Sequence, residues 1–299
     1  MCATDQAATE KPTRSKTKEL EVIVADVIKE TPDTVTLLLF TGNEELCYRP
    51  GHFLTIDPHQ FPALDRFTRF LEDTKGRREP ARAYSMASAP HEKHLAITVK
   101  EEPYVSGKTP YPPLLSPLLV RQTPVGTPMV VTGFAGPFTL PQDIGEKTDH
   151  MVHVAAGSGV VPNFSMIKYA LDNIPDLRHT LICSNKTWDD VIYKWPLKHL
   201  QNTHPGKLKV IHSLTREDAA FPYDDTVRAG RISRDLLWKA IDDPMAAEYF
   251  ICGPGITPHD RKAAKENHTV AAPRFMETVL GLLEELDVDP KKIHKESYG

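Results

Sequence analysis

The chain has 299 residues, of which 40% are hydrophobic and 25% are charged, so it can bury a sizeable core. Its 36 Lys and Arg residues against 40 Asp and Glu residues give a net charge of −4, which argues against a nucleic-acid-binding protein with a basic face. The sequence contains no apolar run of the ~20 residues that are needed to span a membrane. Residues 1–18 are polar and lack the apolar stretch of a signal peptide, so we expect a cytoplasmic protein with no membrane partner.

The four cysteines are far apart, at positions 2, 47, 183 and 252. Structural zinc sites and ferredoxin-type iron–sulfur clusters need closely spaced thiolates. The sequence therefore predicts no metal site, and any iron–sulfur step would take place on another protein.

The first half of the chain is expected to be rich in β-structure. A disordered tail is predicted over residues 1–18, because these residues are small, polar and charged. Short apolar runs separated by turn residues then predict strands at 21–27, 34–40, 52–56, 95–100 and 127–132. This pattern favours an antiparallel barrel or sandwich over residues 19–143.

Two connections do not fit a minimal barrel. In residues 57–81, apolar side chains at positions 61, 64, 67, 70 and 71 predict a short amphipathic helix. Packing of this helix on its own barrel is the simpler interpretation, and a docking surface for a partner is the alternative. The second connection, residues 101–115, is rich in Pro and Tyr.

The second half of the chain alternates between strands and helices. Strands are predicted at 150–156, 179–185, 208–214, 248–252 and 292–298, and helices at 163–173, 189–201 and 275–286. Such alternation is typical of βαβ units that build a parallel sheet covered by helices. The domain boundary is expected between residues 141 and 149, which gives a second domain over residues 144–299.

A glycine turn follows the first strand of this second domain. Gly157, Ser158 and Gly159 precede Pro162, which suits the first turn of a helix. Glycines in this position let the backbone approach a pyrophosphate, whose charge the helix N-terminus favours. Taken alone, the turn could equally be a tight strand–helix connection without a ligand.

The ends of the next two strands indicate which dinucleotide would bind. The second strand ends at Asn185-Lys186, without the acidic residue that binds the ribose 2′-hydroxyl of NAD. Thr215 and Arg216 follow the third strand and make a plausible pair for the 2′-phosphate of NADP, because Arg contacts phosphate bidentately. The alternative for Lys186 and Arg216 is an ordinary solvated loop position.

A third motif lies in the β-rich half, at Arg82, Tyr84 and Ser85. A flat aromatic ligand with a phosphate needs a stacking surface, a hydrogen-bond partner for a ring nitrogen and a cation, and these residues can supply all three. The alternative is an ordinary barrel strand with an exposed Arg.

Three motifs, taken together, closely resemble those of the ferredoxin–NADP reductase family of flavoproteins. They are R-x-Y-S-x-x-S at 82–88, G-x-G-x-x-P at 157–162 and C-G-P at 252–254. Further similar segments are P-G-H-F at 50–53, G-F-A-G-P-F at 133–138, G-R-I at 230–232 and I-H-K-E-S-Y at 293–298. The resemblance covers residues 19–299 and is nearest to the reductase modules of oxygenases and flavohaemoglobins. It implies an antiparallel flavin-binding barrel followed by a parallel-sheet domain that binds the nicotinamide dinucleotide.

The resemblance also assigns the flavin contacts. Tyr84 would stack on the isoalloxazine ring, Ser85 would hydrogen-bond near flavin N5, and Arg82 would contact the FAD pyrophosphate. The strand that lines the FAD ribose and diphosphate would carry Ile97, Val99 and Lys100. The family holds the pyrophosphate with a G-x-x-S turn, and here the glycines are replaced in residues 112–118, where Ser116 best matches the family serine.

For the second cofactor, the resemblance implies that Gly157, Ser158 and Gly159 hold the dinucleotide pyrophosphate and that Thr215 and Arg216 bind the 2′-phosphate.

The remaining family residues lie near the chemistry. Cys252 and Gly253 would place a thiol beside the nicotinamide, and Glu296 and Tyr298 match the family's terminal E-x-Y. In plant-type members the terminal aromatic residue covers the flavin and gates nicotinamide entry. The predicted catalytic residues are therefore Ser85, Cys252, Glu296 and Tyr298.

The sequence thus predicts an FAD-dependent oxidoreductase that takes hydride from NADPH, with NADH possible, and passes electrons to a separate ferredoxin, flavodoxin, haem protein or oxygenase component. One alternative is the reductase subunit of a stable multi-subunit enzyme, with an interface at 57–81 and 101–115. The other is a regulatory protein that binds flavin or dinucleotide without turnover. An insertion at 257–273 is interpreted as a solvated or basic loop, the latter suited to an acidic electron carrier.

Overall fold

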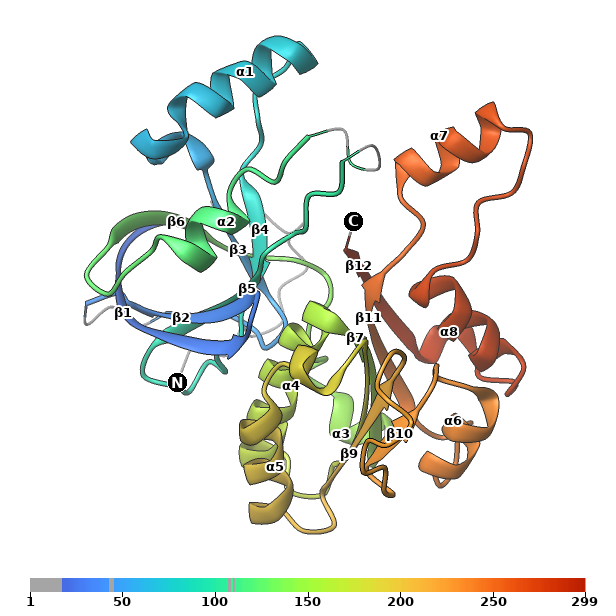
Figure 1. The fold of residues 1–299 in the computed structure, drawn as a ribbon. Helices are drawn as coiled ribbons and strands as arrows, with labels where there is room; N and C mark the ends of the chain where they lie inside the picture. Colours follow the sequence, from blue (N-terminus) through green and yellow to red (C-terminus); the bar gives the residue numbers. More distant parts are fainter. Residues whose placement is uncertain (1–17, 43–45, 107–108, 110, 299) are drawn as a thin grey trace, which may run out of the picture.

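The structure is a computed structural model that describes residues 18–298 except 43–45, 107–108 and 110. The tail predicted over residues 1–18 therefore lies almost entirely outside the described residues. Two sheets of six strands each form the two halves of the molecule (Figure 1). No helix of the described residues is long and apolar enough to cross a membrane.

The first half is an antiparallel barrel. Its strands are β1 (Lys18–Thr31), β2 (Thr34–Phe40), β3 (Phe53–Ile56), β4 (Arg82–Ser85), β5 (Leu95–Lys100) and β6 (Pro128–Ala135). They lie in the order β4-β3-β6-β1-β2-β5, and every pair is antiparallel. A bridge between Met86 and Ile97 joins the two ends of the sheet and closes the barrel. The predicted fold class is confirmed for this half.

Alternation of side chains along the strands fills the barrel. Leu20, Val22 and Val24 on β1 are buried while their neighbours are exposed, as expected for a strand with one face to a core. The helix α2 (Ser116–Arg121) lies against this core through Leu119, which is fully buried.

The first insertion contains the predicted helix, α1 (Asp65–Lys75), preceded by the short 3₁₀ turns η1 (Pro58–Gln60) and η2 (Pro62–Leu64). The predicted amphipathic character is seen in Leu71, which is fully buried, and in Phe61, Leu64 and Phe67, which are partly buried. Phe61 and Leu64 pack against the barrel core, whereas Phe70 is 56% exposed and stacks on Phe67 with ring centroids 6.3 Å apart. Figure 1 shows α1 projecting beyond the barrel.

The second half is a parallel sheet covered on both faces. Its strands are β7 (His150–Ala156), β8 (Arg178–Asn185), β9 (Leu208–Leu214), β10 (Val227–Ala229), β11 (Glu248–Pro254) and β12 (Ile293–Tyr298). Their order is β10-β9-β8-β7-β11-β12, so the winding reverses between β7 and β11. The predicted boundary between residues 143 and 144 lies in the connection from β6 to β7.

Helices pack on this sheet in two layers (Figure 1). One layer holds α3 (Ile144–Lys147), α4 (Val160–Asn173) and α5 (Lys194–Thr203), and the other holds α6 (Arg234–Ala240) and α8 (Phe275–Glu284). The second layer is apolar toward the strands: Leu237 of α6 and Leu283 of α8 are fully buried in one cluster with Val152. The remaining 3₁₀ turns are η3 (Gly157–Gly159), η4 (Trp188–Asp190) and η5 (Pro290–Lys292).

Two sequence predictions for this half are wrong in detail. The helix predicted at 189–201 is broken into η4 and α5, because Tyr193 takes a left-handed conformation with φ of 58°. Its hydroxyl hydrogen-bonds Thr98 of the barrel and its ring is buried, so the break coincides with a contact between the halves. The insertion at 257–273 is not a loop throughout, since it contains the helix α7 (Pro258–Glu266).

The two halves share a packed junction. Ala87 and Ala96 of the barrel lie in one buried cluster with Val160, Val161 and Phe164 of α4. Nearby, the Ser165 hydroxyl donates to the carbonyl of Ser88 at 2.7 Å, which adds a directional contact to the apolar one. The sites described below are therefore built on a fixed arrangement of barrel and sheet.

Candidate functional site

A cavity of about 680 Å³ lies along the carboxyl ends of the parallel strands. It includes the point between β7 and β11 where the strand order reverses, the place where open α/β sheets bind ligands. Predicted site residues from four strand ends line it, namely Gly157, Ser158, Lys186, Thr215, Arg216 and Tyr298. The structure thus brings together segments that are up to 140 residues apart in the chain, from Ser158 to Tyr298.

The cavity has a strong excess of positive charge. Its lining includes five cationic side chains, those of Lys100, Lys186, Arg216, Arg231 and Arg274, against a single carboxylate, that of Asp190. Lys100 and Arg274 form ion pairs with carboxylates outside the lining, so the excess rests on Lys186, Arg216 and Arg231. That carboxylate accepts hydrogen bonds from the backbone N–H and the hydroxyl of Thr187, so it caps a turn. A cavity with this charge is suited to a ligand that carries several phosphates.

The turns after β8 and β9 hold each other in place. The backbone N–H of Thr215 donates to the carbonyl of Asn185 at 3.0 Å, and that of Arg216 donates to the carbonyl of Lys186 at 2.7 Å. Both Lys186 and Arg216 have exposed side chains at the cavity. The predicted phosphate pair and the neighbouring lysine therefore lie on two turns that are fixed by backbone hydrogen bonds.

The two glycines of the G-x-G turn have different structural tasks. Gly157 has φ of 54°, a conformation that glycine adopts without strain, and space beside it is open. Gly159 is buried, and a Cβ there would lie 2.0 Å from the carbonyl oxygen of Cys252. Gly157 and Ser158 line the cavity, whereas Gly159 allows η3 to pack against β11.

A buried polar chain that the sequence analysis missed supports this turn. Asn163 donates to the carbonyl of Gly159 at 2.9 Å, so its side-chain oxygen accepts from Nδ1 of His153, also at 2.9 Å. The Nε2 of His153 is then an acceptor for Nδ1 of His179 at 3.1 Å. All three side chains are buried, and burial lowers the pKa of His153 to about 4, so the chain is neutral near pH 7. No local sequence signal marks these residues as partners.

The four predicted catalytic residues meet where the two halves join. Cys252 and Glu296 are register partners on β11 and β12, and Tyr298 follows two residues later. The hydroxyls of Tyr298 and Ser85 lie 2.8 Å apart, which links β12 to the barrel strand β4.

Electrostatics differs among these residues. Cys252 is fully buried, and burial, followed by the nearby Glu296, raises the pKa of its thiol, so the group is protonated at neutral pH. Burial raises the pKa of Glu296 to about 7, and its Oε2 contacts no hydrogen-bond partner among the described residues. The carboxyl group can therefore gain or lose a proton near neutral pH.

Gly253 beside this group permits a further close contact. A Cβ at this position would lie 2.5 Å from the ring of Phe275, the first residue of α8. The glycine lets α8 begin directly beside the cavity, which Phe275 lines.

In the barrel, the buried carboxylate of Glu79 orients Arg82, the residue that is predicted to contact the FAD pyrophosphate. Glu79 is 2% exposed and accepts from Nη2 of Arg82 and from Nζ of Lys75, both at 2.6 Å. Burial alone would raise the pKa of Glu79, but its hydrogen bonds with Lys75 and Arg82 hold it below the usual value. The sequence analysis missed Glu79, which belongs to the 57–81 insertion.

The other predicted flavin residues are placed as follows. Tyr84 is half-buried against the barrel core, and Ile97 and Val99 are buried inside that core, so their contact with FAD stays a prediction. Lys100 lines the cationic cavity and forms an ion pair with Asp33 at 2.6 Å.

Ser116 is the first residue of α2 and is mostly buried. Its hydroxyl accepts from the backbone N–H of Glu102 at 3.2 Å, and so holds the segment that follows β5. Its predicted contact with FAD stays a prediction.

Comparisons with known proteins agree with this geometry. Residues 153–258 match the family described as the oxidoreductase NAD-binding domain. The ferredoxin reductase component of the 3-ketosteroid-9-alpha-monooxygenase of Mycolicibacterium smegmatis is 31% identical over 251 residues, which are 79% of this chain and 58% of that protein. The crystal structure of the cytochrome b5 reductase domain of Ulva prolifera nitrate reductase has a TM-score of 0.70 at 20% identity, with coverage of 96% of this chain and 100% of that one. The chain has the fold of these reductases and resembles the reductase relatives in sequence.

Another relative carries a different name. NADH-cytochrome b5 reductase 2 of Aspergillus oryzae is 28% identical over 165 residues, which are 54% of this chain and 48% of that protein. The chain spans about half the length of the curated relatives it matches.

Proposed function

We propose that this chain is an FAD-dependent oxidoreductase that takes hydride from NADPH and passes the electrons to a separate acceptor protein. The observation that carries the proposal is the cationic cavity that ends at the junction of the halves, where Ser85, Cys252, Glu296 and Tyr298 meet. A cytoplasmic location, expected from the sequence, belongs to the same proposal.

The residues present fit both cofactors. Five cations and the Gly157 turn suit a dinucleotide, and Tyr84 with the oriented Arg82 suits a flavin that carries phosphates. Bound FAD would supply the redox chemistry, because it accepts two electrons and releases them singly.

The protein groups would position the nicotinamide and the flavin ring and would hold a proton near them. Cys252 is a neutral thiol fixed by burial, so its contribution is shape at the nicotinamide end of the cavity. The Ser85 hydroxyl would be the barrel's hydrogen-bond partner for the flavin ring. The Glu296 carboxyl would hold a proton that it can exchange near neutral pH.

NADPH is proposed over NADH because the cavity carries cations that suit the additional phosphate of NADPH. No acidic residue ends β8, and Lys186 and Arg216 lie on turns that are tied together. An acidic residue would bind a free ribose 2′-hydroxyl, whereas cations favour a 2′-phosphate. The acceptor is proposed to be a ferredoxin, flavodoxin, haem protein or oxygenase component, in line with the ferredoxin reductase named among the relatives.

The test is reconstitution of the purified chain with FAD or FMN, followed by measurement of NADPH oxidation with ferricyanide as electron acceptor. We expect activity that depends on FAD, and a drop in kcat of about a hundredfold for Ser85→Ala. Ser297→Ala is the matched control, since this exposed hydroxyl lies one residue from Tyr298. Failure to bind either flavin, or equal kcat values for Ser85→Ala and wild type, would contradict the proposal.

A further inference from the structure

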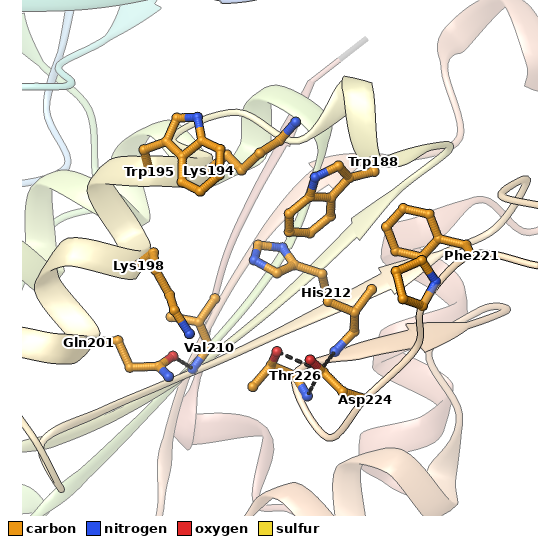
Figure 2. A pocket seen from close by; sticks show the side chains of 12 residues that line it. Trp188, Lys194, Trp195, Lys198, Gln201, Val210, His212, Phe221, Asp224 and Thr226 are labelled. Carbon is orange, nitrogen blue, oxygen red and sulfur yellow. Dashed lines mark hydrogen bonds between the residues drawn. The ribbon is translucent and has the colours of Figure 1, made fainter.

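A second cavity, of about 300 Å³, lies on the α5 side of β9 and β10 (Figure 2). It shares no lining residue with the cationic cavity. The chain connects β9 to β10 by a loop over residues 215–226, so α5 and this loop enclose a pocket beside the edge strand. Nothing in the proposed electron transfer uses it.

Four of the twelve residues that line this second cavity are aromatic. The rings of Trp188 and Phe221 have centroids 5.9 Å apart, and the ring of His212 lies perpendicular to Trp188 at 5.3 Å. Val210 and Val227 add apolar surface. Walls of this kind favour a flat ring, because aromatic pairs gain from edge and offset contacts in addition to burial.

Two lysines stand at one side of the pocket. Lys194 and Lys198 are four residues apart on α5, and Nζ of Lys194 lies 4.9 Å from the centre of the Trp188 ring. Within the described part of the chain, neither lysine forms an ion pair. The only carboxylate of the lining, that of Asp224, accepts three hydrogen bonds from its own turn through Oδ1. Lys198 also interacts electrostatically with Asp224, so the two lysines and this one carboxylate leave a net charge of about +1 for an anionic ligand.

His212 supplies an unused polar group. Its side chain is 6% exposed, and its Nδ1 has no hydrogen-bond partner among the described residues. Burial lowers its pKa to about 4, so at neutral pH the ring offers one donor and one acceptor. Figure 2 shows this ring between Trp188 and Asp224, facing the interior of the pocket. A buried polar atom without a partner marks a position where a ligand can complete a hydrogen bond.

We propose that this cavity is a binding site for a small planar aromatic carboxylate, with its ring against Trp188 and Phe221 and its carboxylate toward Lys194 and Lys198. The two lysines attract an anionic group, and a carboxylate is the smallest such group that a pocket of this volume can hold beside a ring. A volume at the lower limit of ligand pockets restricts the ligand to one or two rings.

Calorimetric titration of the full chain with three probes tests the chemistry. Benzoate has the ring and the charge, benzamide has the ring without the charge, and cyclohexanecarboxylate has the charge without a flat ring. We expect saturable binding of benzoate that is about tenfold tighter than that of either other probe. No saturable binding of benzoate, or equal affinity for all three, would overturn the proposal.

Substitutions in the lining of the pocket test whether benzoate binds there. Lys194→Gln combined with Lys198→Gln is expected to weaken benzoate about tenfold and to leave benzamide unchanged. Phe221→Leu is expected to weaken benzoate more than cyclohexanecarboxylate. Lys239→Gln, an exposed lysine on α6, is the matched control and should change nothing. Unaltered benzoate affinity in the double lysine variant contradicts the site.

A titration in the presence of saturating NADP⁺ separates the two cavities. Because they share no lining residue, we expect benzoate to bind with its affinity retained within about threefold. Complete competition by NADP⁺ would mean that the pocket is part of the nucleotide site, and the proposal of a separate ligand would fail.

Discussion

In the parallel-sheet half, the backbone shapes the proposed cofactor site, whereas in the barrel half, side chains from an insertion do so. The cationic cavity forms where strand ends meet, and backbone hydrogen bonds between the β8 and β9 turns fix its cations. In the barrel, Arg82 is oriented by Glu79, a residue of the 57–81 insertion. The first site follows from topology, and the second depends on a particular set of ion pairs.

This difference predicts which kind of substitution would damage the site in each half. A site made by close backbone packing is expected to fail through steric changes at glycine. A site oriented by a buried carboxylate is expected to fail through loss of that charge.

The largest effect is expected at the glycine turn. Gly159→Ala would place a Cβ 2.0 Å from the carbonyl oxygen of Cys252, so we expect a loss of about 3 kcal/mol in the free energy of unfolding. Gly157→Ala is the matched variant, because its Cβ meets open space and only the left-handed backbone is strained, at a cost of about 1 kcal/mol. Urea unfolding measures both. Equal losses would show that packing of η3 on β11 does not matter.

The next effect concerns the choice of nucleotide. Arg216→Ala removes a cation of the cavity, and a lost charge-assisted hydrogen bond of about 2 kcal/mol corresponds to about a thirtyfold rise in KM for NADPH. The KM for NADH should stay within about threefold of wild type. Arg234→Ala, outside the cavity, is the control. Equal changes for both nucleotides would remove Arg216 from the 2′-phosphate site.

A smaller effect is expected in the barrel. Glu79→Gln removes the charge that holds Lys75 and Arg82, and we expect FAD affinity to fall about tenfold. Because the folded pKa of Glu79 is lowered, its contribution to stability is present above the pKa of the unfolded chain and is lost as the pH falls. Flavin fluorescence titration measures the affinity. Unchanged FAD binding would separate Arg82 from the flavin site.

The last prediction concerns the pH dependence of stability at the junction. Burial raises the folded pKa of Glu296 to about 7, so between the unfolded pKa of about 4.3 and this value wild-type stability should fall as the pH rises. Glu296→Gln removes this term, and its stability relative to wild type should increase over the same range. Urea unfolding of both proteins at several pH values measures this difference in the free energy of unfolding. A constant difference between the two proteins would mean that Glu296 has an ordinary pKa.

The sequence was sufficient to predict the two kinds of sheet and most strand positions. Alternating burial along β1 and the Gly157 turn after β7 are local signals, and both lie where predicted. The capping residues Thr257 and Asp260, with Pro258 between them, are a local signal for α7 that could have corrected the loop prediction.

Other features arise from contacts that no local pattern encodes. The break before α5 lies at Tyr193, whose hydroxyl hydrogen-bonds Thr98, 95 residues away. Asn163 with Gly159 and Glu79 with Arg82 are contacts over three or four residues and could have been found locally. His153 and His179 are 26 residues apart and meet only because β7 pairs with β8. Such residues become visible as parts of a site only once the chain is folded.

The most direct measurement is an anaerobic absorbance titration of the FAD-loaded protein with NADPH and, in parallel, with NADH. The account predicts that the flavin bands bleach with NADPH and do so much more slowly with NADH. Bleaching at equal rates would contradict the assignment of the cationic cavity to the 2′-phosphate. A flavin that neither nucleotide reduces would contradict the proposed hydride transfer itself.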